Sequence, residues 1–389
     1  MTQTHKLPLP DIAAQQLSMT LQQHIQSAIH QHNGWLRFDL FMQHCLYYPG
    51  LGYYQNTLPK LGAAGDFVTA AEISPLYAAT FANHIAEVLI QTTGDCLEFG
   101  AGSGQFAVDL LKQLQQRQHL PKRYFILETS ATLQQRQRQL IHQQIPALID
   151  RVHWLAQLPD NFTGAIIANE VCDAMPVRSF QIGAGQIVER GIGLIGQGEL
   201  AWQTQPVQDA AILASLQAVS NEIPNFGFIT EVNQTALAWV NTLAERLAHG
   251  AIFIADYGYP FQDYFHVSRA EGGIHCHYRH QVHDDVFFWP GLQDITAHLN
   301  FSELAEAAYV AGLTVSAFQT QRDFLISGEI LTLIQSEQPT LAQVAALKQL
   351  LLPNMMGERF KVLTLTREIA LPRLQQGDQR QRLASSYEQ

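Results

Sequence analysis

The 389-residue sequence predicts an α/β fold, a Rossmann-like parallel sheet with helices on both faces. Three observations predict it. Short apolar segments alternate with segments of helical periodicity from residue 95 onward. A glycine-rich stretch, "EFGAGSG" at 98–104, directly follows the first apolar segment. Acidic or amide residues close several of the apolar segments, at the strand ends where open parallel sheets bind ligands.

The composition predicts a packed globular chain. Hydrophobic residues make up 47% of the sequence and charged residues 15%, so a large core is expected and wholesale disorder is not. The formal net charge is −11. Phosphate contacts need clustered Lys and Arg, so the composition argues against general nucleic-acid binding.

The cysteines and the apolar runs bear on the compartment. The four cysteines are far apart, at positions 45, 96, 172 and 276, and form no CxxC motif. This pattern favours a reducing compartment, and we expect a cytoplasmic protein. The first residues, "MTQTHKLPLPDIAAQQL", do not have the pattern of a signal peptide. No apolar run approaches 18 residues, so we predict no membrane span.

The first 90 residues predict a helical region followed by loops. Leu17, Leu21, Ile25 and Ile29 recur at four-residue spacing and predict a helix. Residues 35–80 are denser in Gly, Pro and Tyr, as in loops that carry binding residues. A second helix is expected from Pro75 to about residue 91.

The predicted sheet is assigned strand by strand. The strands, in order, are "DCLEFG", "RYFILETS" ending in Glu128, "VHWL", "GAIIANEV" ending in Asn169 and Glu170, and "AIFIADYGYP" ending in Asp256. A helix with apolar residues at 106, 107, 110, 111 and 114 follows the glycines, and a Gln-rich helix follows the second strand. "FSELAEAAYVAGLTVSAF" predicts a helix, a glycine stop and a strand, and "ERFKVLTLTR" a last strand.

Two long segments interrupt this core and set the predicted domain boundaries. Residues 181–249 are too many for one crossover helix, so they predict an insertion. The predicted organisation is an N-terminal helical and lid region (1–90), the first part of the core (91–180), the insertion (181–249), a core strand (250–260), a substrate-side loop (261–300), the end of the core (301–370) and a tail (371–389).

The glycines indicate a backbone that turns sharply and approaches a ligand. Gly100, Gly102 and Gly104 lie between the first strand and its helix. Glu128 ends the next strand, where a carboxylate can accept hydrogen bonds from two ribose hydroxyls. The site therefore suits an adenosine-containing cofactor. A tight turn that binds no ligand is the alternative.

The details of the loop favour S-adenosyl-L-methionine. The third glycine of the dinucleotide pattern G-x-G-x-x-G is replaced by Gln105, and the Walker pattern is absent. Glu98 before the loop would repel phosphate and favour a cation. S-adenosylmethionine carries an ammonium and a sulfonium but no phosphate, and E-x-G-x-G-x-G is the pattern of class I methyltransferases.

Eight motifs lie in order along residues 35–368. They are "YYPGLGYY", "GDFVTAAEIS", "LEFGAGSGQFA", "NEVCDAMPV", "IADYGYP", "GGIHCHYRHQVHDD", "PGLQDITAHLNF" and "LLPNMMGERFKVL". In this order they resemble the MidA family of class I S-adenosylmethionine-dependent methyltransferases, with departures at Tyr48, Ala71 and "IHCHYRH". The family includes mitochondrial factors that symmetrically dimethylate an arginine of a respiratory complex I subunit.

Together, loop and resemblance give a predicted cofactor site and a predicted acceptor site. An arginine acceptor must lose a proton as the methyl arrives, and carboxylates can fix its guanidinium and take up charge. Glu170 is the leading candidate and Asp173 the second; loop bridging and a helix start are their alternative roles. The predicted cofactor residues are Glu98, Gly100, Ala101, Gly102, Ser103, Gly104, Glu128, Thr129 and Asn169, and the predicted substrate or lid residues are Asp66, Phe67, Thr69, Asp256, Tyr257, Arg279, His280 and His283.

The stretch "GGIHCHYRHQVHDD" allows a second interpretation, a zinc site built from its histidines and Cys276. Hydrogen bonds of His280 and His283 within an ordered loop are favoured, so no metal is predicted.

The sequence therefore predicts a protein arginine methyltransferase that uses S-adenosyl-L-methionine and acts on a partner protein, which by resemblance is a complex I subunit. A methyltransferase with another acceptor and a non-catalytic assembly factor remain alternatives. No nucleic-acid partner is expected, and the oligomeric state stays open.

Overall fold

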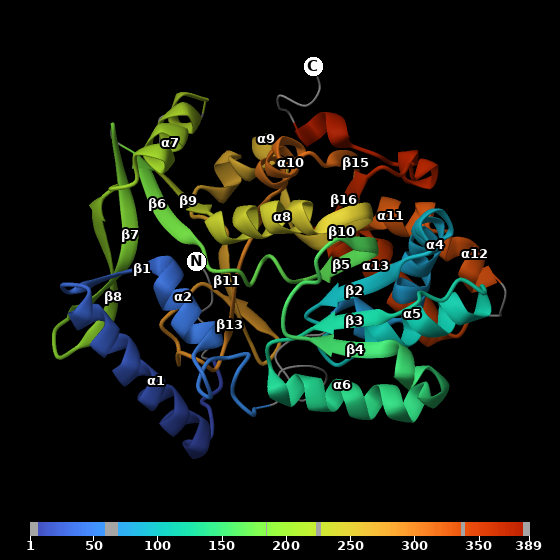
Figure 1. Cartoon of the computed structure of the whole chain (residues 1–389). Coiled ribbons are helices and arrows are strands. Elements are labelled where there is room, and N and C mark those ends of the chain that lie inside the picture. Colours follow the sequence, from blue (N-terminus) through green and yellow to red (C-terminus); the bar gives the residue numbers. More distant parts are fainter. Residues whose placement is uncertain (1–6, 59–68, 184, 223–226, 336–338, 384–389) are drawn as a thin grey trace. The chain divides into compact units, whose positions relative to one another are not determined.

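The computed structural model describes residues 7–58, 69–183, 185–222, 227–335 and 339–383. The chain divides into two compact units, and each is described by itself. The accessory unit comprises Met1–Phe67, Ala174–Thr235 and Gln262–His298. The core unit comprises Val68–Asp173, Ala236–Phe261 and Leu299–Gln389. Figure 1 labels the elements of both.

The core unit is built on one sheet with the strand order β15-β16-β10-β5-β2-β3-β4, and β14 also pairs with β10. Its first five strands in the chain pair in parallel, as predicted, but β16 is antiparallel to both of its neighbours. The sheet is therefore mixed, which corrects the all-parallel expectation. The strands are β2 (Asp95–Phe99), β3 (Tyr124–Leu127), β4 (Val152–Leu155), β5 (Phe162–Asn169), β10 (Leu247–Tyr259), β14 (Leu299–Asn300), β15 (Thr314–Thr320) and β16 (Phe360–Arg367).

Side chains of both sheet faces are buried, so helices cover both. Ala251 and Phe253 of β10 pack into one apolar cluster with helices α4 and α5. Ile252 and Ile254, which alternate with them along the strand and so face the other side of the sheet, are also fully buried. The helices of this unit are α3 (Ala70–Ile73), α4 (Pro75–Thr92), α5 (Gln105–Gln116), α6 (Ala131–Gln144), α8 (Gln234–Arg246), α10 (Phe301–Val310), α11 (Gln321–Ser327), α12 (Ile330–Gln335) and α13 (Leu341–Leu351).

Local sequence explains where several helices begin and end. Ser74 caps α4 by accepting a hydrogen bond from the Leu76 amide, with proline at the next position. The Ser130 side chain accepts a hydrogen bond from the Leu133 amide at the start of α6. Gly312, with φ +84°, ends α10 where the sequence predicted a glycine stop.

The accessory unit contains two further sheets that the sequence analysis did not identify. One has the order β1-β7-β6-β9, with β8 paired to β7, and the other the order β12-β11-β13; their paired strands are antiparallel. The elements are α1 (Ile12–Gln31), β1 (Trp35–Arg37), α2 (Phe38–Tyr47), β6 (Arg178–Gly183), β7 (Gln186–Ile195), β8 (Glu199–Pro206), α7 (Ala210–Glu222), β9 (Phe228–Val232), α9 (Phe261–Tyr264), β11 (Ile274–Tyr278), β12 (Gln281–His283) and β13 (Asp294–Ala297).

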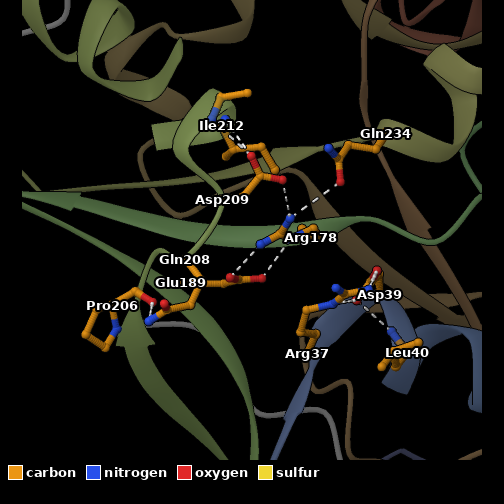
Figure 2. Close-up of polar contacts among 11 residues, drawn as sticks. Arg37, Asp39, Leu40, Arg178, Glu189, Pro206, Gln208, Asp209, Ile212 and Gln234 are labelled. Atoms are coloured by element: carbon orange, nitrogen blue, oxygen red, sulfur yellow. Dashed lines mark hydrogen bonds and ion pairs between the residues drawn. The ribbon is translucent and has the colours of Figure 1, made fainter. Parts of the chain in front are cut away.

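A buried ion pair ties three segments of the accessory unit together (Figure 2). The Arg178 guanidinium of β6 donates to both carboxylate oxygens of Glu189 on β7, at 2.8 and 2.7 Å. Its Nη1 donates to Asp209 at 3.3 Å, and Asp209 in turn accepts the amides of Ala211 and Ile212 at the start of α7. The side chains of Arg178 and Glu189 are only 8% and 3% exposed, so this pair is shielded from solvent.

None of the helices in the described part of the chain combines the length and the apolar character needed to cross a bilayer.

Candidate functional site

The glycine loop joins β2 to α5 in the core unit. Gly100, Gly102 and Gly104 have φ values of +58°, +52° and +88°, a region that other residues rarely adopt. The Gly100 amide donates to the Leu127 carbonyl at 3.0 Å, which ties the loop to the end of β3. A β-carbon at Gly104 would lie 3.3 Å from the backbone of Gln137 on α6. Local geometry thus favours glycine at these positions, and the hydrogen bond of Gly100 holds the loop against the neighbouring strand end.

Glu98 is the last residue but one of β2, directly before the glycine loop in the sequence, and it is buried. It is 3% exposed, and its carboxylate accepts a hydrogen bond of 2.6 Å from the Tyr124 hydroxyl. Burial raises the pKa of Glu98 to about 8, since desolvation penalises the charged form. A cation bound nearby would favour the ionised form.

Glu128 follows β3 directly; the strand itself ends at Leu127, one residue earlier than predicted. Its Oε1 accepts the Ser130 amide at 2.8 Å, and its Oε2 accepts the Gln137 side-chain amide at 3.1 Å. Burial raises its pKa, and the hydrogen bonds from Ser130, Gln137 and Thr129 act in the opposite direction. The carboxylate is therefore held in one orientation, with capacity left for further donors.

Gln137 is a residue of this site that the sequence analysis missed. It lies on α6, is fully buried, and also donates to the Gly102 carbonyl at 3.0 Å. Its carbonyl oxygen accepts the indole N–H of Trp154 on β4 at 2.9 Å. The sequence does contain one feature that could have identified it: Gln137 lies four residues from both Leu133 and Ile141, the other buried residues of α6.

These residues fit an adenosine cofactor that carries positive charge. The loop between β2 and α5 contains neither Lys nor Arg, so it offers no phosphate cradle. It brings three left-handed glycines between two buried carboxylates, Glu98 and Glu128. Such a donor set can accept ribose hydroxyls and stabilise an ammonium.

The end of β5 places an amide and a carboxylate side by side. The Tyr77 hydroxyl of α4 donates to Asn169 Oδ1 at 2.5 Å, and Asn169 Nδ2 donates to Glu170 Oε1 at 3.3 Å. Glu170 has φ +54°, and its amide donates to the Ala255 carbonyl of β10 at 2.9 Å. A glutamate in the left-handed region is unusual, and such backbone strain is often found at functional sites.

Asp256 lies in β10 directly after Ala255, the last residue that pairs with β5, and organises the turn that follows Glu170. The strand continues to Tyr259, three residues beyond its predicted end. One of its oxygens, Oδ2, accepts the amides of Cys172 and Asp173 at 2.9 and 3.2 Å, and the other accepts the Tyr257 amide at 2.8 Å. Asp256 is fully buried, and its pKa is raised well above the ordinary value by burial, then by the charge of Asp173 and also of Glu170. Three carboxylates, Glu170, Asp173 and Asp256, are thus grouped just beyond the last paired residues of β5 and β10.

Two other predicted residues of the core unit have local roles, and two cannot be placed. Thr69 directly precedes α3, and its carbonyl accepts the amides of Glu72 and Ile73. The Tyr257 ring lies 3.9 Å from the ring of its cross-strand partner Phe360. Asp66 and Phe67 lie outside the described residues.

Arg279, His280 and His283 belong to the accessory unit. Arg279 and His280 form the exposed two-residue turn between β11 and β12, with φ values of +46° and +61°. Both ring nitrogens of His283 are buried and have no hydrogen-bond partner among the described residues, which contradicts the loop hydrogen bond expected of His283. In the described part of the chain, no group of three or more His, Cys, Asp or Glu side chains is arranged to hold a metal.

The strand order, the antiparallel β16 and the glycine loop after β2 define a class I S-adenosylmethionine-dependent methyltransferase fold. A family model described as "Putative S-adenosyl-L-methionine-dependent methyltransferase" matches residues 78–319. The chain belongs to this family, which confirms the MidA resemblance. S-adenosyl-L-methionine is its cofactor.

Solved structures and curated proteins agree with this assignment. A Burkholderia thailandensis protein described as a "likely methyl transferase", bound to S-adenosyl-homocysteine, is 37% identical with a TM-score of 0.92, covering 96% of this chain and 99% of that one. Protein arginine methyltransferase NDUFAF7, mitochondrial, of Danio rerio is 27% identical, covering 86% of this chain and 84% of its own. The Homo sapiens protein of that name is 25% identical, covering 84% and 78%.

Proposed function

We propose that this methyltransferase transfers a methyl group from S-adenosyl-L-methionine to an arginine side chain of a partner protein. The observation that carries the proposal is the group of three carboxylates, Glu170, Asp173 and Asp256, just beyond the last paired residues of β5 and β10. The names of the relatives, protein arginine methyltransferases that match most of this chain, support the same acceptor.

The chemistry of a guanidinium explains why carboxylates are needed. Bound S-adenosyl-L-methionine supplies the methyl group on a positively charged sulfur. The acceptor nitrogen belongs to a group whose pKa exceeds about 12, so it must lose a proton as the new bond forms. A carboxylate beside the guanidinium fixes its planar fork, concentrates lone-pair density on one nitrogen and can accept the proton directly or through water.

Each residue of the core unit has a proposed task. The loop from Glu98 to Gly104, with Ala101 and Ser103, would hold the methionine end of the cofactor, and Glu128, Thr129 and Asn169 its adenosine end. Glu170 would orient the guanidinium, because it directly follows Asn169 in the sequence and its backbone is held by the hydrogen bond from its amide to the Ala255 carbonyl. Asp256 would hold the turn that carries Asp173, since it accepts that amide. These roles remain predictions.

The partner and the product belong to the same proposal. By resemblance to the MidA family, the acceptor would be a respiratory complex I subunit and the product a symmetrically dimethylated arginine. Asp66, Phe67, Thr69, Tyr257, Arg279, His280 and His283 are proposed to contact the acceptor or to close over the cofactor. A cytoplasmic location is proposed as well, since all four cysteines are buried and free.

Methylation of extract from a strain that lacks this protein tests the proposal. The purified protein and labelled S-adenosyl-L-methionine are added, and modified residues are identified by mass spectrometry. The proposal expects label on arginine of one or a few proteins. Label on a small molecule or on another side chain would favour a methyltransferase with a different acceptor, and binding of cofactor without any transfer would favour an assembly factor.

A further inference from the structure

We infer that Gln137 is a positioning residue of the cofactor site, which aims the Glu128 carboxylate at the ribose hydroxyls of S-adenosyl-L-methionine. The inference rests on the proposed role of Glu128 and adds a residue whose side chain holds that carboxylate in place. It does not depend on which group accepts the methyl.

The burial pattern of α6 sets Gln137 apart from the other glutamines of this helix. Three residues of α6 are buried, namely Leu133, Gln137 and Ile141, at spacings of four. They form the inward stripe of an otherwise polar helix, and Gln137 occupies its centre, where an apolar residue is expected. A buried amide is costly unless its hydrogen bonds are made.

All three contacts that the Gln137 amide makes come from different segments of the core unit. Nε2 donates to the Gly102 carbonyl of the glycine loop at 3.0 Å and to Glu128 Oε2 at 3.1 Å. Oε1 accepts from Trp154 Nε1 at 2.9 Å. Because an indole N–H can only donate, Trp154 fixes which end of the amide faces β4 and which faces the loop and Glu128.

The result is a side chain that couples the loop to the carboxylate. Both hydrogens of Nε2 are used, one toward each part of the site. The Ser130 amide holds Oε1 of Glu128 at 2.8 Å while Gln137 holds Oε2, so neither oxygen can rotate away without breaking a buried hydrogen bond. The Thr129 amide donates to the same carboxylate, so three of its roughly four acceptor positions are filled and one remains for the ribose hydroxyl groups.

The test compares Gln137→Met with Gln139→Met, an exposed glutamine of the same helix. Calorimetry measures the affinity of each protein for S-adenosyl-homocysteine and for its analogue without the two ribose hydroxyls. Gln137→Met should weaken the binding of S-adenosyl-homocysteine by about tenfold, the effect of losing one charge-assisted hydrogen bond. It should weaken the binding of the analogue much less. Gln139→Met should change neither. Equal weakening of both ligands, or no weakening, would overturn the inference.

A second variant keeps the test decisive should Gln137→Met not fold. Trp154→Phe keeps an aromatic ring on β4 and removes only the N–H that orients the amide. It should also reduce the ratio of the affinities for S-adenosyl-homocysteine and for the analogue, by a smaller factor than Gln137→Met does. A full wild-type preference in Trp154→Phe counts against the inference.

Glu128→Gln separates the inference from the proposed site. If Glu128→Gln leaves the preference for the hydroxylated ligand unchanged, the ribose site itself is wrong. If Glu128→Gln abolishes that preference but Gln137→Met does not, only the role of Gln137 fails. If both are right, the double variant should bind no more weakly than Glu128→Gln alone, because the two residues act as one unit.

Discussion

At the scale of single residues, the core unit places buried acids in or directly after three strands of its sheet, β2, β3 and β10. Glu98, Glu128 and Asp256 are each less than a tenth exposed, and burial is the first cause of the raised pKa of all three. Each accepts at least one hydrogen bond from a neighbouring element. A site poised in this way favours ligands that bring positive charge.

Glu98 should make the stability of the free protein depend on pH. Its pKa is about 8 in the folded protein and 4.5 ordinarily, so the folded state binds more protons between these values. This contribution to the free energy of unfolding is complete below pH 4.5 and is lost as the pH rises toward 8. Glu98→Gln should lessen that loss, measured by urea unfolding from pH 5 to 8.

Glu245→Gln, on an exposed residue of α8, is the control and should keep the wild-type slope. An identical slope in Glu98→Gln would mean that the Glu98 carboxyl ionises as freely in the folded protein as in the unfolded chain.

At the scale of elements, the sequence predicted those strands and helices whose position depends on a local hydrophobic pattern. Apolar blocks of four to eight residues at "VHWL" and "GAIIANEV" correspond to β4 and β5. The direction of β16 was not predicted, since a strand buried on both faces has the same pattern in either orientation. Gln137 was missed because its helix contains several other glutamines, and only its burial distinguishes it from them. The grouping of Asp256 with Asp173 depends on strand order, which a single sequence does not give.

The turn between β11 and β12 should be less stable with Arg279 and His280 than with residues that favour positive φ. Arg279 and His280 both have positive φ, a conformation for which Asn-Gly is the preferred pair. Changing Arg279→Asn together with His280→Gly should therefore raise the free energy of unfolding by about 1 kcal/mol. Urea titration measures this, with Gln281→Asn in the following strand as a control that should not stabilise. A less stable double variant would show that the two side chains contribute contacts that outweigh the strain.

The buried pair of Arg178 and Glu189 should respond unequally to single and double substitution (Figure 2). Glu189→Gln removes the charge opposite a buried guanidinium, whose other side-chain contacts include the partly exposed Asp209 and the neutral Gln234. It should destabilise the protein by about 3 kcal/mol. Replacing both residues, as Arg178→Met with Glu189→Leu, should recover most of that loss because no charge remains buried. Thermal unfolding of the three proteins checks this order. A double variant as unstable as the single one would indicate that the pair stabilises the unit by more than charge balance.

At the scale of the whole molecule, binding of the cofactor product should raise stability selectively. S-adenosyl-homocysteine at a hundredfold excess over its dissociation constant should add about 2.7 kcal/mol to the free energy of unfolding. NAD should add nothing, because the loop after β2 has no Lys or Arg and lacks the third glycine of the dinucleotide pattern. Thermal shift with both ligands distinguishes them. Stabilisation by NAD instead would contradict the reading of the glycine loop.

Glu170→Gln tests whether the carboxylates just beyond the last paired residues of β5 and β10 serve an arginine acceptor. The change keeps the shape of the side chain and removes its charge, so the guanidinium loses a charge-assisted hydrogen bond. The measurement is the rate of methyl transfer to arginine of the partner protein beside the affinity for S-adenosyl-homocysteine. We expect transfer to fall by about a hundredfold or more while the affinity changes little. Transfer at close to the wild-type rate would contradict the account and leave Glu170 with a structural role.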